Sequence, residues 1–338
     1  MKTRDVGIDL GTTSVIVHVA GRGIVMTEPS VVAVNTETDE VIAVGKQAYD
    51  MIGKTPSKIQ AIQPMKDGVI SDYDVTEAML KYYIKRVGES LFFKPRVAVC
   101  IPAMTTEVEQ RATKSAALAV GARKIYLIEE PIAAAIGAGL DISKPCGNMV
   151  VDIGGGTADI AVISLNGTVT ADSVKMAGVK LDEAIVNFIH KKYNVLIGEK
   201  MAERIKIELC NLICPDEKKT MEIKGRNLLQ GLPCRLTVNS KDVYDAIIDE
   251  VRVIVDAIKA VIERTPPELV GDIKTNGITL TGGGALLGGL AEYLTREIGA
   301  EVRAAENPLE CVGVGTGRIF KYIDELGEAF LTSKSLIY

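Results

Sequence analysis

Tryptophan is absent from this chain of 338 residues, and phenylalanine and histidine occur only five and two times. The six cysteines form no CxxC pair and have no histidine beside them in the sequence. Cys210 and Cys214 are one helical turn apart, but two ligands do not make a zinc site. We therefore expect reduced, partly buried thiols, as is usual in a cytosolic protein.

Long apolar runs and an excess of charge of one sign are also missing. No stretch of about 18 uncharged apolar residues occurs, which argues against a transmembrane helix. The start of the chain lacks a basic region followed by an apolar run, so we expect no secretory signal. The 39 basic and 44 acidic side chains give a net charge of −5, so nucleic acid is not an expected partner. The length predicts two domains.

Two distant segments share one design. Residues 6–10 and 149–153 are predicted as buried strands, and each places an aspartate, Asp9 or Asp152, just before a turn of glycine and threonine. Return strands are predicted at 14–20 and 161–165. The sequence therefore predicts two copies of one α/β architecture, with a hinge at 144–147 between them.

Other segments alternate between helical and strand-like patterns. Apolar spacing and capping signals predict helices over residues 75–87, 106–120, 132–140, 181–192, 201–212, 243–264 and 285–298. Strands are predicted over 96–101, 124–128 and 277–281, with a hairpin of 31–34 and 41–44 and short strands around Gly225 and Gly231.

The two glycine turns carry the predicted chemistry. Glycine leaves backbone N–H groups free to face an anion, so one turn from each half could clamp the phosphates of a nucleotide. Asp9 and Asp152 would supply the oxygen ligands that Mg²⁺ prefers, although both could instead cap their turns.

Three further features fit the same site. Glu130 precedes Pro131 and is predicted as a helix N-cap, where the helix dipole would keep it ionised and able to activate a water; an ordinary cap is the alternative. The turn of Gly282, Gly283, Gly284 and Ala285 could approach adenine or a phosphate. Glu203 and Lys206 share a helix face and could reach a ribose, or form a solvated ion pair.

Seven short motifs occur in an order that is specific when taken together. They begin at Asp9, Glu28, Glu129, Asp152, Glu203, Thr281 and Ala305, and read DLGT, EPS, EEP, DIGGGT, ERIK, TGGGAL and AENP. In this order they resemble the MreB/Mbl family of bacterial actin homologues, the rod-shape-determining proteins, over nearly the whole chain.

The resemblance implies the actin-like ATPase fold, with two ribonuclease-H-like α/β domains around a nucleotide cleft and a smaller subdomain on each. The corresponding divisions are subdomain IA at 1–32, 66–145 and 315–338, IB at 33–65, IIA at 146–181 and 246–314, and IIB at 182–245.

The resemblance also implies residue roles for ATP or ADP with Mg²⁺. Asp9 and Asp152 would hold the metal through water, and Glu130 with Thr157 would handle the attacking water. The remaining nucleotide-binding residues would be Thr12, Thr13, Ser14, Gly154, Gly155 and Gly156 at the phosphates, and Glu203, Arg204, Lys206, Gly282, Gly283, Gly284 and Ala285 at the ribose and adenine.

The same family likeness implies slow ATP hydrolysis coupled to assembly into paired antiparallel protofilaments. Such filaments lie on the inner face of the cytoplasmic membrane and guide the cell-wall elongation machinery, which maintains rod shape. The expected membrane contact is Leu91, Phe92 and Phe93, because aromatic side chains flanked by cations suit a bilayer interface; packing in the core is the alternative.

Two other functions share this duplicated fold. A sugar or small-acid kinase would carry the same paired aspartates, but no substrate-binding insertion is apparent. A heat-shock chaperone ATPase needs a peptide-binding domain, for which no room is expected after the last predicted helix.

Overall fold

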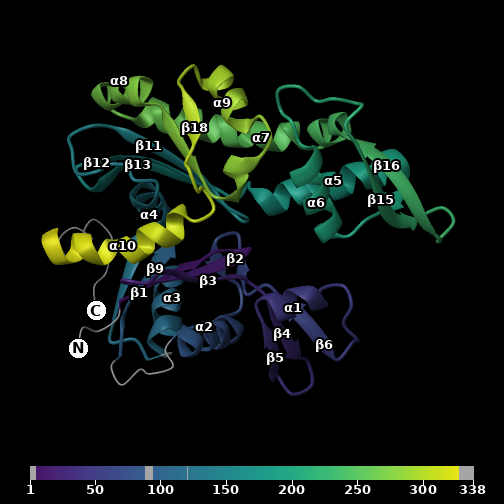
Figure 1. Ribbon diagram of the computed structural model, residues 1–338, viewed down its shortest axis with the longest axis horizontal. Helices are drawn as coiled ribbons and strands as arrows, with labels where there is room; N and C mark the ends of the chain where they lie inside the picture. The colour runs from purple at the N-terminus through teal and green to yellow at the C-terminus, as the bar shows by residue number, and fades with distance from the viewer. Residues whose placement is uncertain (1–4, 88–93, 120, 327–338) are drawn as a thin grey trace.

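A computed structural model describes residues 5–87, 94–119 and 121–326 as two stacked lobes, each built on a five-stranded sheet (Figure 1). The sheet of the first lobe has the order β10 (Lys124–Glu129), β9 (Arg96–Ile101), β1 (Val6–Leu10), β2 (Ser14–Val19) and β3 (Gly23–Pro29). The sheet of the second lobe has the order β18 (Val302–Ala304), β17 (Ile278–Thr281), β11 (Asn148–Ile153), β12 (Ala158–Ser164) and β13 (Gly167–Val174).

The two sheets have the same topology. In the first lobe β1 pairs antiparallel with β2 and parallel with β9, and in the second β11 pairs antiparallel with β12 and parallel with β17. Nearly every residue of β1 and β11 is buried, which explains their continuous apolar sequence. The predicted duplication is therefore confirmed.

Helices cover the outer faces of both sheets. The first lobe carries α2 (Tyr73–Val87) and α3 (Glu107–Ala119), whose start has the predicted capping box: the Thr106 N–H donates to Glu109 at 2.7 Å. The second lobe carries α7 (Ser240–Arg264), α8 (Pro267–Asn276) and α9 (Leu290–Ile298).

Two helices, α4 (Glu130–Gly137) and α10 (Cys311–Leu326), lie between the lobes (Figure 1). Their small residues allow this close crossing, because a Cβ at Gly315 would collide with the backbone of Ala133. Both helices contribute to one apolar core that also contains residues of the two large sheets, so the lobes share a packed base.

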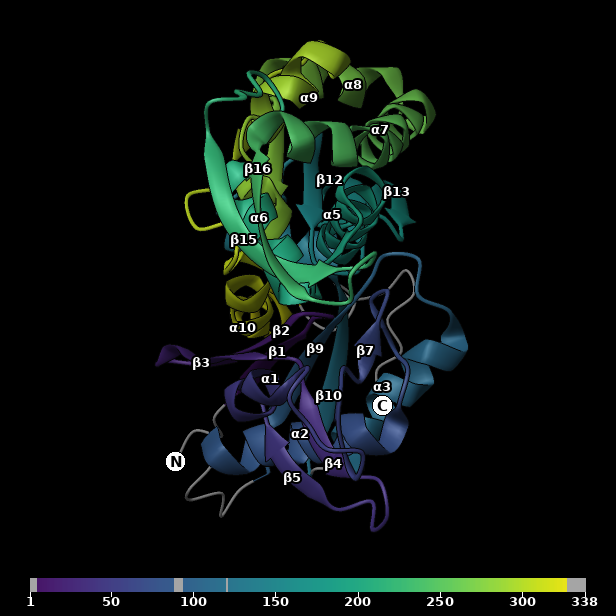
Figure 2. The same ribbon diagram turned by 90° about the vertical axis from the view of Figure 1, so that its right-hand side faces the viewer.

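A small sheet extends from each lobe on the same side of the molecule (Figures 1 and 2). The first consists of β5 (Val41–Val44), β4 (Val32–Asn35) and β6 (Ile59–Ile62), with α1 (Lys46–Met51) packed on it. The second consists of β14 (Val195–Leu196), β15 (Thr220–Asn227) and β16 (Pro233–Asn239), next to α5 (Gly178–Tyr193) and α6 (Glu199–Leu209). A short hairpin of β7 (Met65–Lys66) and β8 (Val69–Ile70) connects the first small sheet to α2.

The subdomain boundaries remain a prediction, but the structure shows where they would fall. The small sheets lie mainly within 33–65 and 182–245. Three boundaries, at 181/182, 245/246 and 314/315, cut through α5, α7 and α10. Continuous helices therefore connect the predicted subdomains.

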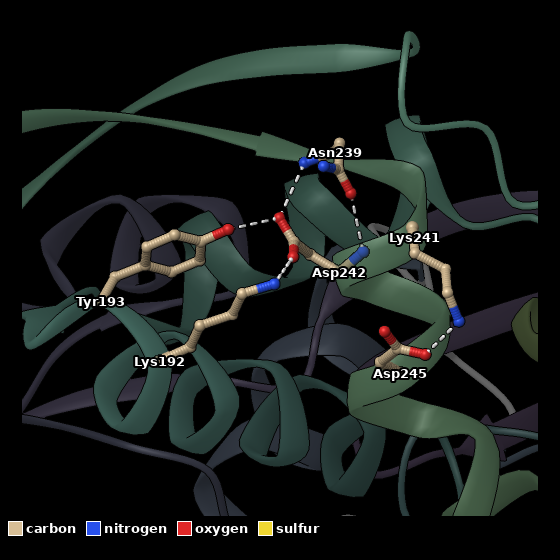
Figure 3. Close-up of polar contacts among 6 residues, drawn as sticks. All are labelled: Lys192, Tyr193, Asn239, Lys241, Asp242 and Asp245. Atoms are coloured by element: carbon tan, nitrogen blue, oxygen red, sulfur yellow. Dashed lines mark hydrogen bonds and ion pairs between the residues drawn. The ribbon is translucent and has the colours of Figure 1, made fainter.

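A fully partnered carboxylate lies at the start of α7 (Figure 3). Asp242 and Asn239 form a reciprocal capping box, with the Asp242 N–H donating to Asn239 at 2.8 Å. Lys192 and Tyr193, at the end of α5, donate to the two carboxylate oxygens of Asp242 at 2.6 and 2.8 Å. This network fastens α5 to α7.

Several local predictions were wrong or incomplete. Residues 285–298 do not form one helix: a 3₁₀ turn, η1 (Gly283–Leu286), precedes α9, and Gly289 has a φ of +77° that breaks the helix. The short strands predicted around Gly225 and Gly231 are β15 and β16, and Gly225 lies inside β15. The strands β3, β6, β7, β8, β13, β14 and β18 and the helices α1, α8 and α10 were not predicted. Within the ranges that the structure describes, no helix is both long and apolar enough to cross a bilayer.

Candidate functional site

A cavity of about 320 Å³ lies between the two lobes. Most of the site residues that the sequence predicts line this cavity. Those lining it are Asp9, Thr12, Thr13, Ser14, Glu130, Asp152, Gly154, Gly155, Gly156, Thr157, Glu203, Lys206, Gly282, Gly283 and Gly284. Predicted site residues from Asp9 to Gly284 thus meet around one space.

The glycine turns of the two lobes face one another directly. A Cβ at Gly155 would collide with the side chain of Thr13, and a Cβ at Gly156 would collide with the hydroxyl of Thr12. Gly68, in the β7–β8 turn, donates its N–H to the Thr12 hydroxyl at 3.1 Å. Only glycine permits backbone to approach so closely here, and the result is a narrow slot lined by main-chain groups suited to phosphate.

The paired aspartates lie at the ends of the two equivalent strands. Asp9 is the next-to-last residue of β1, just before the glycine turn. Asp152 lies in β11 and accepts a hydrogen bond from the Thr281 hydroxyl at 2.6 Å. Burial, with a smaller contribution from neighbouring carboxylates, raises the pKa of both carboxyls to about 7, and for Asp152 the hydrogen bond from Thr281 opposes this rise. Both carboxyls therefore hold protons readily until a cation is present.

Glu130 departs from its predicted environment. The N-cap of α4 is Glu129, and Glu130 is the first residue of the helix. Burial, followed by the charges of Asp159, Asp9 and Asp152, raises the pKa of Glu130 well above its usual value. The prediction that the helix dipole keeps this carboxyl ionised is therefore wrong: burial and repulsion outweigh the dipole.

Glu203 and Lys206 do not pair with each other as a solvated ion pair would. Lys206 contacts Asp182 at 2.8 Å and donates to the carbonyl of Gly178 at 2.9 Å. Glu203 instead accepts from the hydroxyl of Tyr49, in α1, at 3.3 Å. Burial raises the pKa of Asp182 to about 6, against the opposing effect of Lys206.

Some predicted site residues lie elsewhere. Arg204 is exposed and pairs with Glu208 at 2.7 Å, one helical turn along α6, so it does not line the cavity. Ala285 is buried within η1 and does not line it either. Leu91, Phe92 and Phe93 lie outside the described residues.

The cavity has an apolar wall that sequence reasoning missed. Ile207, Leu286 and Leu309 are 71, 59 and 57% exposed yet line this space together. Together they give this cavity an apolar side, a kind of lining that ligand pockets commonly have. The sequence analysis gave these three side chains no role, because single exposed apolar residues are common on any protein surface.

The charge of the cavity bears on the predicted metal. Its lining carries five carboxylates, Asp9, Glu130, Asp152, Asp182 and Glu203, against one ammonium group, Lys206. A polyphosphate would therefore need a cation to enter. Across residues 5–87, 94–119 and 121–326, no three His, Cys, Asp or Glu side chains form a metal cage. Two carboxylates with open positions nevertheless suit Mg²⁺, which usually keeps several waters and takes phosphate oxygens as ligands.

Comparison with known proteins assigns this architecture to a family. The family model described as MreB/Mbl protein matches residues 3–328. The chain belongs to the MreB/Mbl family. The cell shape-determining protein Mbl of Bacillus subtilis (strain 168) is 52% identical over 327 residues, which cover 96% of this chain and 98% of that protein.

Solved structures of the MreB/Mbl family have the same fold. MreB5 of Spiroplasma citri bound to ADP has a TM-score of 0.92 and 37% identity, covering 96% of this chain and 98% of its own. The AMPPNP-bound form has a TM-score of 0.90 and 36% identity over the same shares of the two chains. The fold is therefore actin-like, as the motifs indicated, and this similarity favours the MreB/Mbl interpretation over the sugar-kinase alternative.

Proposed function

We propose that this chain is an ATP-binding actin-type protein that polymerises into membrane-associated filaments and thereby determines cell shape. The observation that carries the proposal is the duplicated design, in which each lobe presents a glycine turn and a carboxylate to one cavity. Support comes from the similarity to MreB5 bound to ADP and AMPPNP and to a relative named for determining cell shape.

The lining suggests how the chain would bind a nucleotide. The turns at Thr12–Thr13–Ser14 and Gly154–Gly156 would hold the phosphates through backbone N–H groups, and Asp9 and Asp152 would hold Mg²⁺. Bound Mg²⁺ would supply positive charge against the phosphate oxygens. Lys206 and Glu203 would contact the ribose, and the wall of Ile207, Leu286 and Leu309 would pack against adenine.

Hydrolysis would depend on Glu130 and Thr157. Both line the cavity beside the phosphate turns. The raised pKa of Glu130 makes it a stronger base once it is ionised, so it would take a proton from water as the water oxygen attacks the terminal phosphorus. The bond between that phosphorus and the ADP oxygen would break, which yields ADP and phosphate.

The proposed assembly uses this slow reaction as a timer. ATP-bound protomers would assemble into paired antiparallel protofilaments on the inner face of the cytoplasmic membrane, where they would organise the cell-wall elongation machinery. Closure of two lobes around a ligand is a common way to couple binding energy to such a switch.

Sedimentation with phosphate-release assays tests this function. We expect micromolar protein to pellet with Mg-ATP and to release phosphate slowly, without any added second substrate. Protein that stays in the supernatant and forms ADP only when a sugar or small acid is added would instead establish the kinase alternative.

A liposome arm tests the membrane contact. The double variant Phe92→Ser with Phe93→Ser should still bind ATP but should no longer co-pellet with liposomes. Unchanged co-pelleting would place the membrane contact elsewhere.

A further inference from the structure

One buried carboxylate beside the cavity has no role so far. Asp159 lies in β12, two residues after Thr157, and its side chain is 0% exposed. It is the cross-strand partner of Asp152, so both side chains lie on the same face of the sheet. Asp159 therefore lies beside Asp152 but does not itself line the cavity.

The hydrogen bonding of Asp159 is incomplete and crosses between the lobes. Its Oδ1 accepts from the N–H of Ala103 at 3.0 Å. Ala103 follows β9 of the first lobe, whereas β12 belongs to the second. Its Oδ2 meets no donor with hydrogen-bond geometry in the part of the chain that the structure describes. A buried carboxylate oxygen without a donor is costly, which makes a purely structural role a poor explanation.

Asp159 acts on both predicted water-handling residues. Burial raises the pKa of Asp159, and the Ala103 N–H with the nearby side chains of Thr157 and Ser173 opposes that rise. After burial, the charge of Asp159 is the largest influence on the carboxyl of Glu130. Asp159 thus lies near both groups, with an Oδ2 that could accept a proton donor such as the Thr157 hydroxyl.

The surroundings make this arrangement sensitive to the position of the lobes. A Cβ at Gly68 would lie 2.7 Å from Pro102 and 3.0 Å from Thr157, so the β7–β8 turn, the end of β9 and the start of β12 are in tight contact. Pro102 is the residue before Ala103. A shift of one lobe against the other would therefore lengthen the bond from Ala103 to Asp159.

We propose that Asp159 is a positioning residue, which orients the Thr157 hydroxyl toward the attacking water and is itself held by Ala103 when the lobes are closed. This inference rests on the proposed ATPase function. It adds a residue that connects lobe closure to hydrolysis, without touching the nucleotide itself.

The variants Asp159→Asn and Asp159→Ala separate charge from hydrogen bonding. Asparagine keeps the shape and an oxygen for the Ala103 N–H but removes the charge, whereas alanine removes both. We expect kcat for phosphate release to fall on the order of 10- to 100-fold, as for other displaced catalytic groups, with KM and ADP affinity changed less than about threefold. Pelleting with AMPPNP should persist, because assembly with this analogue needs no hydrolysis.

Asp242→Asn is the matched control, because it alters a buried aspartate far from the cavity whose oxygens are all partnered. It should lower the melting temperature and leave kcat unchanged, whereas Asp159→Asn should lower kcat without lowering the melting temperature. Unchanged kcat in Asp159→Asn, or a loss that follows its melting temperature, would overturn the inference while leaving the ATPase intact. Absence of phosphate release by the unaltered protein would instead overturn the proposed function, and the inference with it.

Discussion

Carboxyl groups in two regions of this protein have opposite surroundings: one has hydrogen-bond donors and the others lack cationic partners. Asp242, at the start of α7, receives hydrogen bonds from Lys192, Tyr193 and the Asn239 backbone (Figure 3). The four carboxyls around the cleft, those of Asp9, Glu130, Asp152 and Asp159, have no Lys or Arg partner among the residues that the structure describes. Burial raises the pKa of all four.

This difference is the one expected between a carboxylate that stabilises the fold and carboxyls that, as proposed, bind a cation and its ligand. A charge that only stabilises the fold is supplied with donors within the protein, because an unpartnered buried charge is costly. A cluster of like charges without partners lowers stability and persists where a bound cation and substrate will complete it. Predictions that alter one group and spare the other test this comparison.

The largest expected effect is on turnover. Glu130→Ala should retain nucleotide binding but reduce phosphate release by about 10²- to 10⁴-fold, the usual contribution of a general base. The loss should occur without loss of stability, because it removes a carboxyl that burial and three neighbouring carboxylates oppose. Single-turnover phosphate release and urea unfolding measure the two quantities.

The adjacent Glu129 provides the control for this variant. Its carboxylate accepts from the Thr168 hydroxyl at 2.7 Å and does not line the cavity. Glu129→Gln should turn over normally. Equal turnover of Glu130→Ala and the unaltered protein would contradict the proposed role of Glu130.

The second effect is on stability alone. Asp242→Ala removes a helix cap and leaves Tyr193 and Lys192 without their acceptor, so the free energy of unfolding should fall by about 2 to 3 kcal/mol. Phosphate release at 25 °C should be unchanged. Chemical denaturation measures the free energy of unfolding. An unchanged unfolding midpoint for Asp242→Ala would show that the network around Asp242 does not stabilise the fold.

The smallest effect is a pH dependence that comes from the cleft. The pKa of Asp9 and of Asp152 is about 7 in the folded protein and 3.8 in the absence of the fold. Between these values the folded state keeps protons that the unfolded state has lost, so stability from these groups falls as pH rises from about 4 to 7.

The nucleotide-free protein should therefore melt a few degrees lower at pH 8 than at pH 5.5. Asp152→Asn should reduce that difference, and Mg-ATP should bind more tightly as pH rises because its carboxylate ligands must lose their protons. Identical pH profiles for Asp152→Asn and the unaltered protein would show that this carboxyl is not perturbed by burial.

Local sequence was sufficient to predict the strands that carry the site. The continuous apolar residues around Asp9 and Asp152 reflect burial on both sides of a sheet, and the glycines after them fix the turns. The helix predicted over 285–298 failed because Gly288 and Gly289 break it, with Gly289 in a left-handed conformation. Edge strands such as β3 and β13 were missed because their half-buried residues give a weak pattern.

Site residues were predictable only where chemistry marks them. Aspartates before glycine turns are unusual enough in a buried strand to identify. The apolar wall at Leu286 and Leu309 was not predictable, because those leucines come to line the cavity only through their position in the fold. Arg204 was included with its motif, yet it lies on the solvent side of α6, while its neighbours Glu203 and Lys206 line the cavity.

The sequence by itself determined the duplicated strand and turn design, the carboxylate in each copy and the membership of a family, because these depend on residue type and short spacing. Only the tertiary structure decided that Thr13 meets Gly155, that Ala103 reaches Asp159 across the lobes and that Glu130 is held against three other carboxyls. Such contacts join residues that are far apart in the chain, and burial shifts the pKa values of the carboxyl groups among them. Neither distance in space nor burial is a property of a local sequence pattern.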